Sequence, residues 1–429
     1  MTRSLMVRCG WAALLAATTL LLASCGGGGS DSSGSTNLRV LNATNDVTSL
    51  DVYLGDSKTA SAVVADTPTS YASVSAASYT VKVTSAGDTS TLFSGSYTLS
   101  KDLHYTAVVW GRTGSLKLAT LPEDDNTDNI TSGSGRVRIY NATSDAGSVD
   151  VYLTQGVDDL ANATPIASSV ISASLGGYKE LSAGTYRLRI TGAGDFSDLR
   201  LDVPALTITA KQYSTLIVTA GPGGVLVNSA HLLQQGALTA LKNTQARMRV
   251  IAGADASGSV TVKVDGVTRQ GSLRSPRIGP YILVDAGARL VDVSLNNVSV
   301  SSTTQTLTAG GDYTLLTIGT GASGQVQLIT DDNRLATSGR YRIRLINAAA
   351  SIEPATLSVD LKVLVSDIPS GASSSFVTAT ATTAARLEVT SSSFEVDALT
   401  DVKLQSLGVY TVFVLGGGST PAITPVQDR

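Results

Sequence analysis

The chain has 429 residues, of which 42% are hydrophobic and 15% charged, and its formal net charge is −3. Lysine and arginine form no cluster, which argues against nucleic acid as a partner. The two cysteines, Cys9 and Cys25, both lie in the first 25 residues. Neither a disulfide nor a thiolate metal site is therefore expected in the rest of the chain, and no cofactor is predicted.

Residues 1–24 are predicted to be a signal peptide. Arg3 and Arg8 precede a mostly apolar run at 11–22, and Ala23 and Ser24 are small, which is the pattern of a secretion signal. As a helix the apolar run would span roughly 18 Å, well short of the ~30 Å hydrocarbon core of a bilayer. A secretion signal is therefore favoured over a transmembrane anchor.

The segment Leu22-Ala23-Ser24-Cys25 resembles the lipobox of bacterial lipoproteins. The resemblance implies that Cys25 becomes the first mature residue and carries two or three acyl chains, enough for stable anchoring. Gly26 stands where an aspartate would favour inner-membrane retention, which implies the outer membrane. Residues 25–36 would then be the lipidated cysteine and a flexible Gly/Ser tether.

The rest of the chain contains four copies of one sequence unit. The motif Arg39-Val-Leu-Asn-Ala43 recurs at 138–142 and 344–348, and in altered form at 249–253. Each unit also holds a late tyrosine before an apolar strand, and these tyrosines are 108, 100 and 97 residues apart: Tyr105, Tyr213, Tyr313 and Tyr410. The predicted domain boundaries are 37–122, 136–235, 245–332 and 340–429.

Alternating apolar and polar residues predict β-strands with one buried face and one solvent face. In unit two, Val137 and Ile139 are expected to face the core, and Arg136 and Arg138 to face solvent. Such alternation is typical of antiparallel sheets, whereas parallel strands show unbroken apolar runs. With about seven short strands per 100 residues, the sequence predicts an all-β chain of four tandem immunoglobulin-like antiparallel β-sandwich domains.

The combined pattern R-V-x-N-A, D-V-Y-L, A-G-T-Y-x-L-x-I and Y-T-x-x-V resembles the bacterial domain of unknown function 4397, found in secreted and lipid-anchored proteins. Units one and two carry it most completely. Units three and four keep the late tyrosine and lose the Asp-Val-Tyr triplet. The family has no established activity, so the resemblance implies a fold and a location rather than a function.

Five further residues are candidates for chemistry. His104 and His231 lie in different units without a catalytic motif, so both are expected to be solvated surface side chains. Trp110 aligns with apolar residues of the other units and is expected in the core rather than as a sugar-stacking platform. Asp51 and Asp150 alternate with apolar neighbours and are expected to face solvent.

The acidic segment 123–129 follows unit one, and the segment 331–333 follows unit three. Clustered oxygen ligands between tandem sandwiches can bind calcium, and the order of residues 125–129 faintly resembles the calcium linker of cadherins. The candidate ligands are Asp124, Asp125 and Asp128. Because Asp and Asn are common in any loop, a plain linker is favoured over a calcium site.

The four late tyrosines each follow a turn that is preceded by an apolar residue: Leu99, Ile208, Leu307 and Leu404. This arrangement resembles the tyrosine corner of immunoglobulin-like sandwiches, in which a buried ring sends its hydroxyl to an upstream backbone group. A structural role is therefore favoured over a set of four ligand-binding phenols.

Together these features predict a non-enzymatic, lipid-anchored cell-envelope protein that acts as a surface spacer, adhesive or binding module. Its partners would be the membrane, through the lipid anchor, and an envelope protein, surface protein or glycan, but not nucleic acid. The alternative is an extracytoplasmic enzyme or calcium-dependent binding protein with a site between domains.

Overall fold

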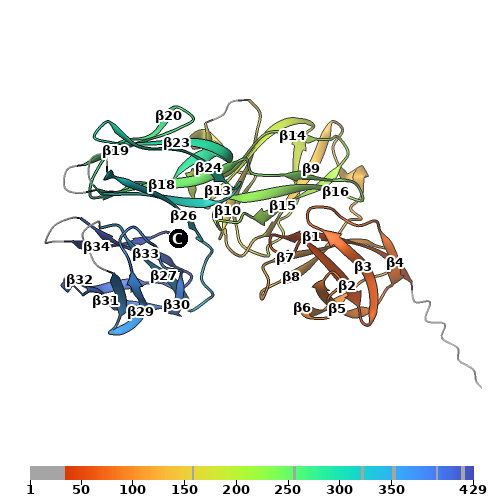
Figure 1. The fold of residues 1–429 in the computed structure, drawn as a ribbon. Helices are drawn as coiled ribbons and strands as arrows, with labels where there is room; N and C mark the ends of the chain where they lie inside the picture. Colours follow the sequence, from red (N-terminus) through yellow and green to blue (C-terminus); the bar gives the residue numbers. More distant parts are fainter. Residues whose placement is uncertain are drawn as a thin grey trace, which may run out of the picture.

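The computed structural model describes residues 34–156, 159–254, 258–319, 323–349, 354–392, 395–416 and 421–429. Within these ranges the protein is all-β, as predicted: the strands form eight sheets, and two short 3₁₀ turns, η1 (Thr127–Asn129) and η2 (Leu160–Asn162), lie in connections between strands (Figure 1). Among these residues there is no helix with the length and hydrophobicity that crossing a membrane requires. The predicted signal peptide and Cys25 lie outside the described residues.

Each sequence unit supplies two sheets. The strands of unit one are β1 (Ser35–Thr44), β2 (Ser49–Leu54), β3 (Ser57–Val64), β4 (Ala72–Ser75), β5 (Ser78–Ser85), β6 (Thr91–Thr98), β7 (His104–Gly111) and β8 (Lys117–Pro122). Those of unit two are β9 (Ser134–Ala142), β10 (Val149–Thr154), β11 (Ala167–Val170), β12 (Lys179–Ser182), β13 (Gly184–Gly192), β14 (Asp195–Ile208), β15 (Tyr213–Ala220), β16 (Val227–Leu233) and β17 (Leu238–Leu241).

The second half of the chain repeats this series. The strands of unit three are β18 (Gln245–Ala254), β19 (Ser259–Val264), β20 (Val267–Arg274), β21 (Arg277–Ile278), β22 (Ile282–Asp285), β23 (Gly287–Leu295), β24 (Val298–Leu307), β25 (Asp312–Gly319) and β26 (Gln325–Asp331). Those of unit four are β27 (Arg340–Asn347), β28 (Ala355–Val359), β29 (Lys362–Ile368), β30 (Val377–Thr380), β31 (Thr382–Ser391), β32 (Glu395–Leu404), β33 (Val409–Leu415) and β34 (Ala422–Gln427).

The four units share one strand order, to which unit two adds β17 and unit three adds a further strand on β18, since both β21 and β22 pair with it. In unit one the sheets run β4-β1-β7-β8 and β3-β2-β5-β6. The corresponding orders are β12-β9-β15-β16-β17 with β11-β10-β13-β14, β21-β18-β25-β26 with β20-β19-β23-β24, and β30-β27-β33-β34 with β29-β28-β31-β32. Strand β17 extends a sheet of unit two into residues that the sequence had left between units.

One strand pair in each unit is parallel, so the expectation of wholly antiparallel sheets is wrong at this pair. The parallel pairs are β1/β7, β9/β15, β18/β25 and β27/β33, and the other paired strands are antiparallel. Strands β7, β15, β25 and β33 are buried along nearly their whole length. Burial on both faces is the usual environment of parallel strands.

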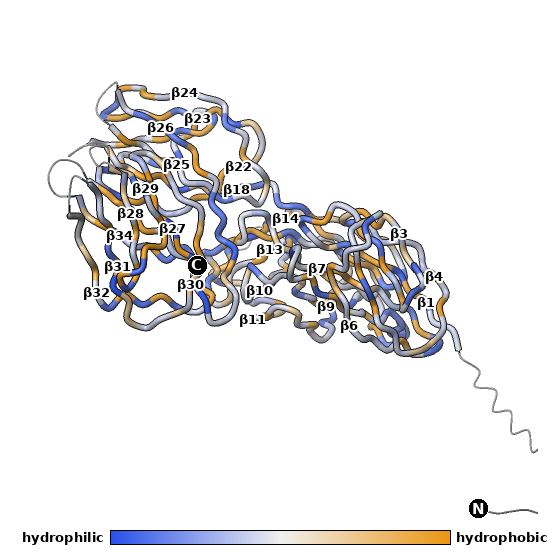
Figure 2. Tube along the Cα trace, turned by 60° about the horizontal axis from the view of Figure 1, so that its bottom comes forward, coloured by the Kyte–Doolittle hydropathy of each residue, from blue (hydrophilic) through white to orange (hydrophobic). Residues whose placement is uncertain are grey.

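A separate hydrophobic cluster fills the space between the two sheets of each unit. In unit one, Val40 and Val109 of one sheet meet Val52 and Val83 of the other. Equivalent clusters lie in units two, three and four. Apolar and polar stretches alternate along the strands in Figure 2, as expected when one side of a strand faces such a core.

Two further hydrophobic clusters lie between units. Leu41 and Trp110 of unit one pack with Tyr140 and Ile217 of unit two. A second cluster joins units three and four: Ile251, Leu316, Ile318, Ile346, Ala348, Phe413 and Leu415. The sheet that contains the parallel pair therefore buries one face in its own unit and the other against the neighbouring unit. Units one and two form one pair, and units three and four form another.

The first strand of each unit places an arginine in these interfaces, so the solvent face expected for Arg138 is wrong. The four residues are at most 7% exposed: Arg39, Arg138, Arg249 and Arg344. Each donates from Nε to a threonine on the parallel neighbour strand, at 2.7 to 3.0 Å: Thr106, Thr215, Thr314 and Thr411. Buried guanidinium groups need such partners to offset the loss of water.

Candidate functional site

The three calcium candidates do not converge: Asp124 and Asp125 bond to separate protein partners, and Asp128 does not join them. Asp124 accepts hydrogen bonds from the backbone N–H of His104, and Asp125 accepts one from the hydroxyl of Tyr178 at 3.0 Å. Asp128 is exposed. In the described part of the chain, no group of three or more His, Cys, Asp or Glu residues is placed to hold a metal ion.

The acidic segments instead join the paired units. Glu123 is 2% exposed and accepts hydrogen bonds from Arg39 of its own unit at 2.7 Å and from the backbone N–H of Gln235 of unit two at 2.6 Å. Asp331 of unit three pairs with Arg344 of unit four at 2.6 Å. Sequence reasoning assigned these acids to linkers because the arginines that neutralise them are distant in the chain.

Three of the late tyrosines have the geometry of a tyrosine corner. Their rings lie in the unit cores, and each hydroxyl accepts a hydrogen bond from the backbone N–H five residues earlier. The oxygen–nitrogen distances are 3.4 Å for Tyr105, 2.8 Å for Tyr313 and 2.8 Å for Tyr410. The hydroxyl therefore satisfies a backbone donor in the preceding turn.

Tyr213 differs from the other three, and the corner expected for it is wrong. In unit two it is Ser214 that pairs with Val137, the register position that the tyrosine occupies in the other units. Tyr213 lies one residue earlier and so points to the opposite face of the sheet. Its hydroxyl donates to the carbonyl of Asn126 at 3.3 Å and accepts from Arg136 at 3.1 Å, beside the segment that joins units one and two.

The two histidines have different environments. His231 is 7% exposed and its Nε2 has no partner among the described residues, so the surface position expected for it is wrong. Burial lowers the pKa of its imidazole to about 4. His104 is half-buried, with Nδ1 2.8 Å from Asp124 and its ring against the edge of Tyr71.

Trp110 is buried, as predicted, although in the cluster between units one and two.

Asp51 and Asp150 are buried, which corrects the expectation that they face solvent. Asp51 accepts hydrogen bonds from the backbone N–H of Ala62, and Asp150 from that of Ser169. Ala62 and Ser169 both have a φ of 50° beside a register shift, so each carboxylate supports a β-bulge. This structural role accounts for the repeated acid.

Threonine takes the same position in the second half of the chain. Thr261 and Thr356 accept from the backbone N–H groups of Ser272 and Asp367, in the corresponding bulges.

The feature that distinguishes unit two is a long connection between β10 and β11. Units one, three and four join the equivalent strands through two residues, at 55–56, 265–266 and 360–361. Unit two uses twelve, 155–166, which include η2. Long structured loops on a rigid scaffold are frequent positions for binding sites.

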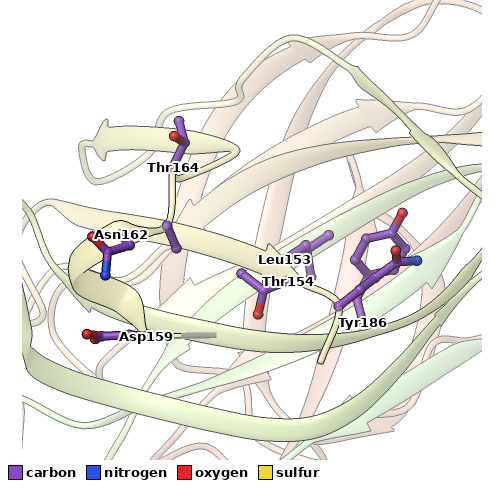
Figure 3. A pocket seen from close by; sticks show the side chains of 8 residues that line it. Leu153, Thr154, Asp159, Asn162, Thr164 and Tyr186 are labelled. Carbon is purple, nitrogen blue, oxygen red and sulfur yellow. The ribbon is translucent and has the colours of Figure 1, made fainter. Parts of the chain in front are cut away.

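The described residues of this connection, 155–156 and 159–166, form one wall of a pocket of about 500 Å³. Asp159, Asn162 and Thr164 of the connection lie at one side, and β10 and β13 supply the other (Figure 3). The pocket is lined by Leu153, Thr154, Gln155, Asp159, Asn162, Ala163, Thr164 and Tyr186. Sequence reasoning named none of these as site residues.

Hydrogen-bonding groups in the pocket are available to a ligand. The side chains of Gln155, Asn162 and Thr164 are exposed, and none bonds to another group of the described residues. Asp159 caps η2 with one oxygen, which accepts from Ala161 N at 3.0 Å. The hydroxyl of Tyr186 donates to the carbonyl of Ser182 at 2.9 Å, which orients its ring. The lining contains no Lys, Arg or His.

Comparison with solved structures gives distant similarities. CBMbc, a family CBM26 domain of Eubacterium rectale Amy13K in complex with maltoheptaose, is 11% identical, covers 46% of this chain and 99% of its own, and has a TM-score of 0.18. The Bacillus anthracis TIE protein is 8% identical, covers 90% of this chain and 68% of its own, and has a TM-score of 0.14. These scores are too low to support an argument. The chain matches no curated protein.

The profile of the DUF4397 family, described as a domain of unknown function, matches twice, at residues 36–152 and 246–361. Together the matches cover more than half of the chain, and they begin at β1 and at β18, the first strands of units one and three. This confirms the resemblance seen in the repeated motifs. The protein belongs to the DUF4397 family.

Proposed function

We propose that the protein is a non-enzymatic, lipid-anchored cell-envelope protein that acts as a binding module. The pocket beneath the 155–166 connection carries this proposal, because it is built from an insertion that the three other units lack. Its hydrogen-bonding side chains lie on that connection, between two strands of a sheet that packs on the core of unit two. Structured loops on a packed β-scaffold are frequent positions for binding sites.

The proposal places the anchor at Cys25 and the folded part beyond a Gly/Ser tether, in the outer membrane. Each of the four units would be one domain, with boundaries at 37–122, 136–235, 245–332 and 340–429. The domains share with immunoglobulin-like sandwiches their two facing sheets and, in three units, the tyrosine corner. Units one, three and four would serve as the spacer that carries unit two.

A fractionation experiment tests the anchor. Cys25→Ser removes the thiol that accepts the lipid, so the variant should move from the membrane fraction to the soluble fraction. Unchanged detergent partitioning of Cys25→Ser would contradict the proposed anchor.

A cosedimentation experiment tests the binding function with the soluble Cys25→Ser protein. It should pellet with isolated cell-envelope fragments. A second variant replaces residues 155–166 with Asp56–Thr59 of unit one, so that β11 keeps its register: Val151 pairs with Ala167 as Val52 pairs with Ala60. This loop-exchange variant should keep its β-structure by circular dichroism and lose cosedimentation. Equal pelleting of the two proteins would place the binding function elsewhere.

A further inference from the structure

We infer that the pocket of unit two takes a neutral, polyhydroxylated ligand, a sugar unit of a glycan. The inference rests on the proposed binding function and names its ligand class. It is drawn from the kinds of side chain that line the pocket and from the way the fold leaves them available.

The lining matches a ligand that both donates and accepts hydrogen bonds. The amides of Gln155 and Asn162 each carry two N–H donors and an oxygen acceptor, and the hydroxyl of Thr164 can do either. Asp159 keeps one carboxylate oxygen beyond the bond to Ala161 N, and it can accept from a ligand hydroxyl. Neighbouring hydroxyls on a sugar ring present this mixture of donors and acceptors over a short distance.

The same residues disfavour other ligand classes. A phosphate or carboxylate would meet the negative charge of Asp159 with no cation in the lining itself; the guanidinium of Arg189 lies behind the lining, 5% exposed and bonded to the hydroxyl of Thr154 at 2.7 Å. A purely apolar ligand would remove the amides of Gln155 and Asn162 from water without replacing their hydrogen bonds, which is unfavourable. A neutral polar ligand avoids both costs.

Apolar surface in the pocket suits the carbon face of a sugar. Leu153 and Tyr186 belong to the core of unit two and are 7% and 8% exposed, so they offer a small apolar patch beside Ala163, and the bond from the Tyr186 hydroxyl to Ser182 keeps the ring in place. A volume of about 500 Å³ lies within the usual range for small-ligand sites. Aromatic and aliphatic groups beside polar ones allow the C–H face and the hydroxyl edge to bind together.

Saturation-transfer NMR with D-glucose, D-galactose, D-mannose and N-acetyl-D-glucosamine tests the ligand class. Sugar concentrations up to about 10 mM are needed, because single sugar units commonly bind with a Kd near 1 mM, which is only about 4 kcal/mol. At least one of the four sugars should give a saturable signal with the Cys25→Ser protein. Asn162→Leu and Gln155→Leu should each weaken it at least tenfold.

The control is Gln305→Leu, which removes an amide from β24 of unit three, outside the pocket. It should bind the sugar as the parent protein does. The inference would be overturned if no sugar gave a signal, or if binding survived in both pocket variants. If the loop-exchange variant still lost envelope binding while no sugar bound, the proposed function would stand and the sugar class alone would fail.

Discussion

His231 is kept neutral by its burial in unit two, where its imidazole pKa is lowered to about 4. In the unfolded chain the pKa of histidine is about 6.5. Between these values the unfolded state binds a proton that the folded state does not, so stability falls as the pH decreases from 6.5 towards 4. The difference of about 2.5 pKa units corresponds to roughly 3 kcal/mol lost at the acid end of this window.

We expect His231→Leu to remove this part of the acid sensitivity. The free energy of unfolding of unit two, measured by denaturant titration at several pH values between 7 and about 4, should fall less steeply in the variant. His104→Gln is the matched control and should retain the parent slope, because His231 is still present. Parallel pH profiles for His231→Leu and the parent protein would contradict this assignment.

Predictions of solvent exposure were wrong for residues that are buried by a segment distant in the sequence. Alternation correctly put Asp51 and Arg138 on the strand face opposite the unit core, but it carries no information about what packs on that face. A bulge surrounds Asp51, and a second unit covers Arg138. Trp110 was predicted buried correctly because hydrophobicity alone decides burial at that position.

At the scale of elements, two of the buried arginines couple the first strand of their own unit to the end of the last strand of the paired unit. Arg249 of β18 contacts Asp428, which follows β34, and Arg344 of β27 contacts Asp331 at the end of β26. The two ion pairs cross the same interface in opposite directions. All four side chains are at most 2% exposed, so screening by solvent is weak.

Arg344→Met should therefore destabilise units three and four by about 3 to 5 kcal/mol, since it leaves the buried carboxylate of Asp331 without its closest cation. Arg187→Met is the control: its pair with Asp202 is partly exposed, and its loss should cost less than about 1 kcal/mol. Denaturant unfolding of both variants measures the difference. Equal costs would mean that the interface pair contributes no more than a surface pair.

Elements were predicted better than their pairing. The unbroken apolar run at 412–415 indicates a strand buried on both faces, which is usual for a strand with a parallel neighbour. The prediction of antiparallel sheets rested on the alternating first strands and did not use this run. The spacing between the repeated motifs also indicates the insertion that forms the pocket. Leu54 and Tyr79 of unit one are 25 residues apart, whereas Leu153 and Tyr186 of unit two are 33 apart. The eight extra residues lie within the 155–166 connection, and their side-chain geometry could not be derived from spacing.

At the scale of the molecule, the two pairs of units are also in contact. In the loop after β15, Gly223 N donates to Gly310 O at 3.0 Å, and Gly223 O accepts from Asn333 N at 3.0 Å. A Cβ on Gly223 would lie 2.8 Å from Asp312 N, so the close approach requires glycine. The C-terminus lies in the middle of the molecule (Figures 1 and 2), where Arg429 donates to Ala146 O at 2.8 Å. Independent domains on flexible linkers, as the sequence suggested, would lack such contacts.

The family matches are consistent with a two-unit repeat. They begin 210 residues apart, which is the length of two units rather than one, and each extends past its first unit into the second strand of the next. Each match thus includes both first strands that meet in a pair interface. The pair of units, rather than the single unit, is the repeating block of this structure.

If the two units of a pair unfold as one cooperative block, a substitution that destabilises unit two should also destabilise unit one. Leu188→Ala removes a fully buried side chain from the core of unit two, at an expected cost of about 2 to 5 kcal/mol. Amide hydrogen exchange of β5 in unit one should then become faster, because the shared cluster around Trp110 and the bonds of Glu123 link the two units.

Leu387→Ala is the matched control for this last experiment. Leu387 pairs with Val359 in unit four as Leu188 pairs with Leu153 in unit two, and it is equally buried. Its loss should speed exchange in units three and four and leave β5 unchanged, since the contacts between pairs are fewer than those within a pair. Unchanged exchange of β5 in Leu188→Ala would show that single units unfold independently. Faster exchange of β5 in both variants would make the whole chain one cooperative block.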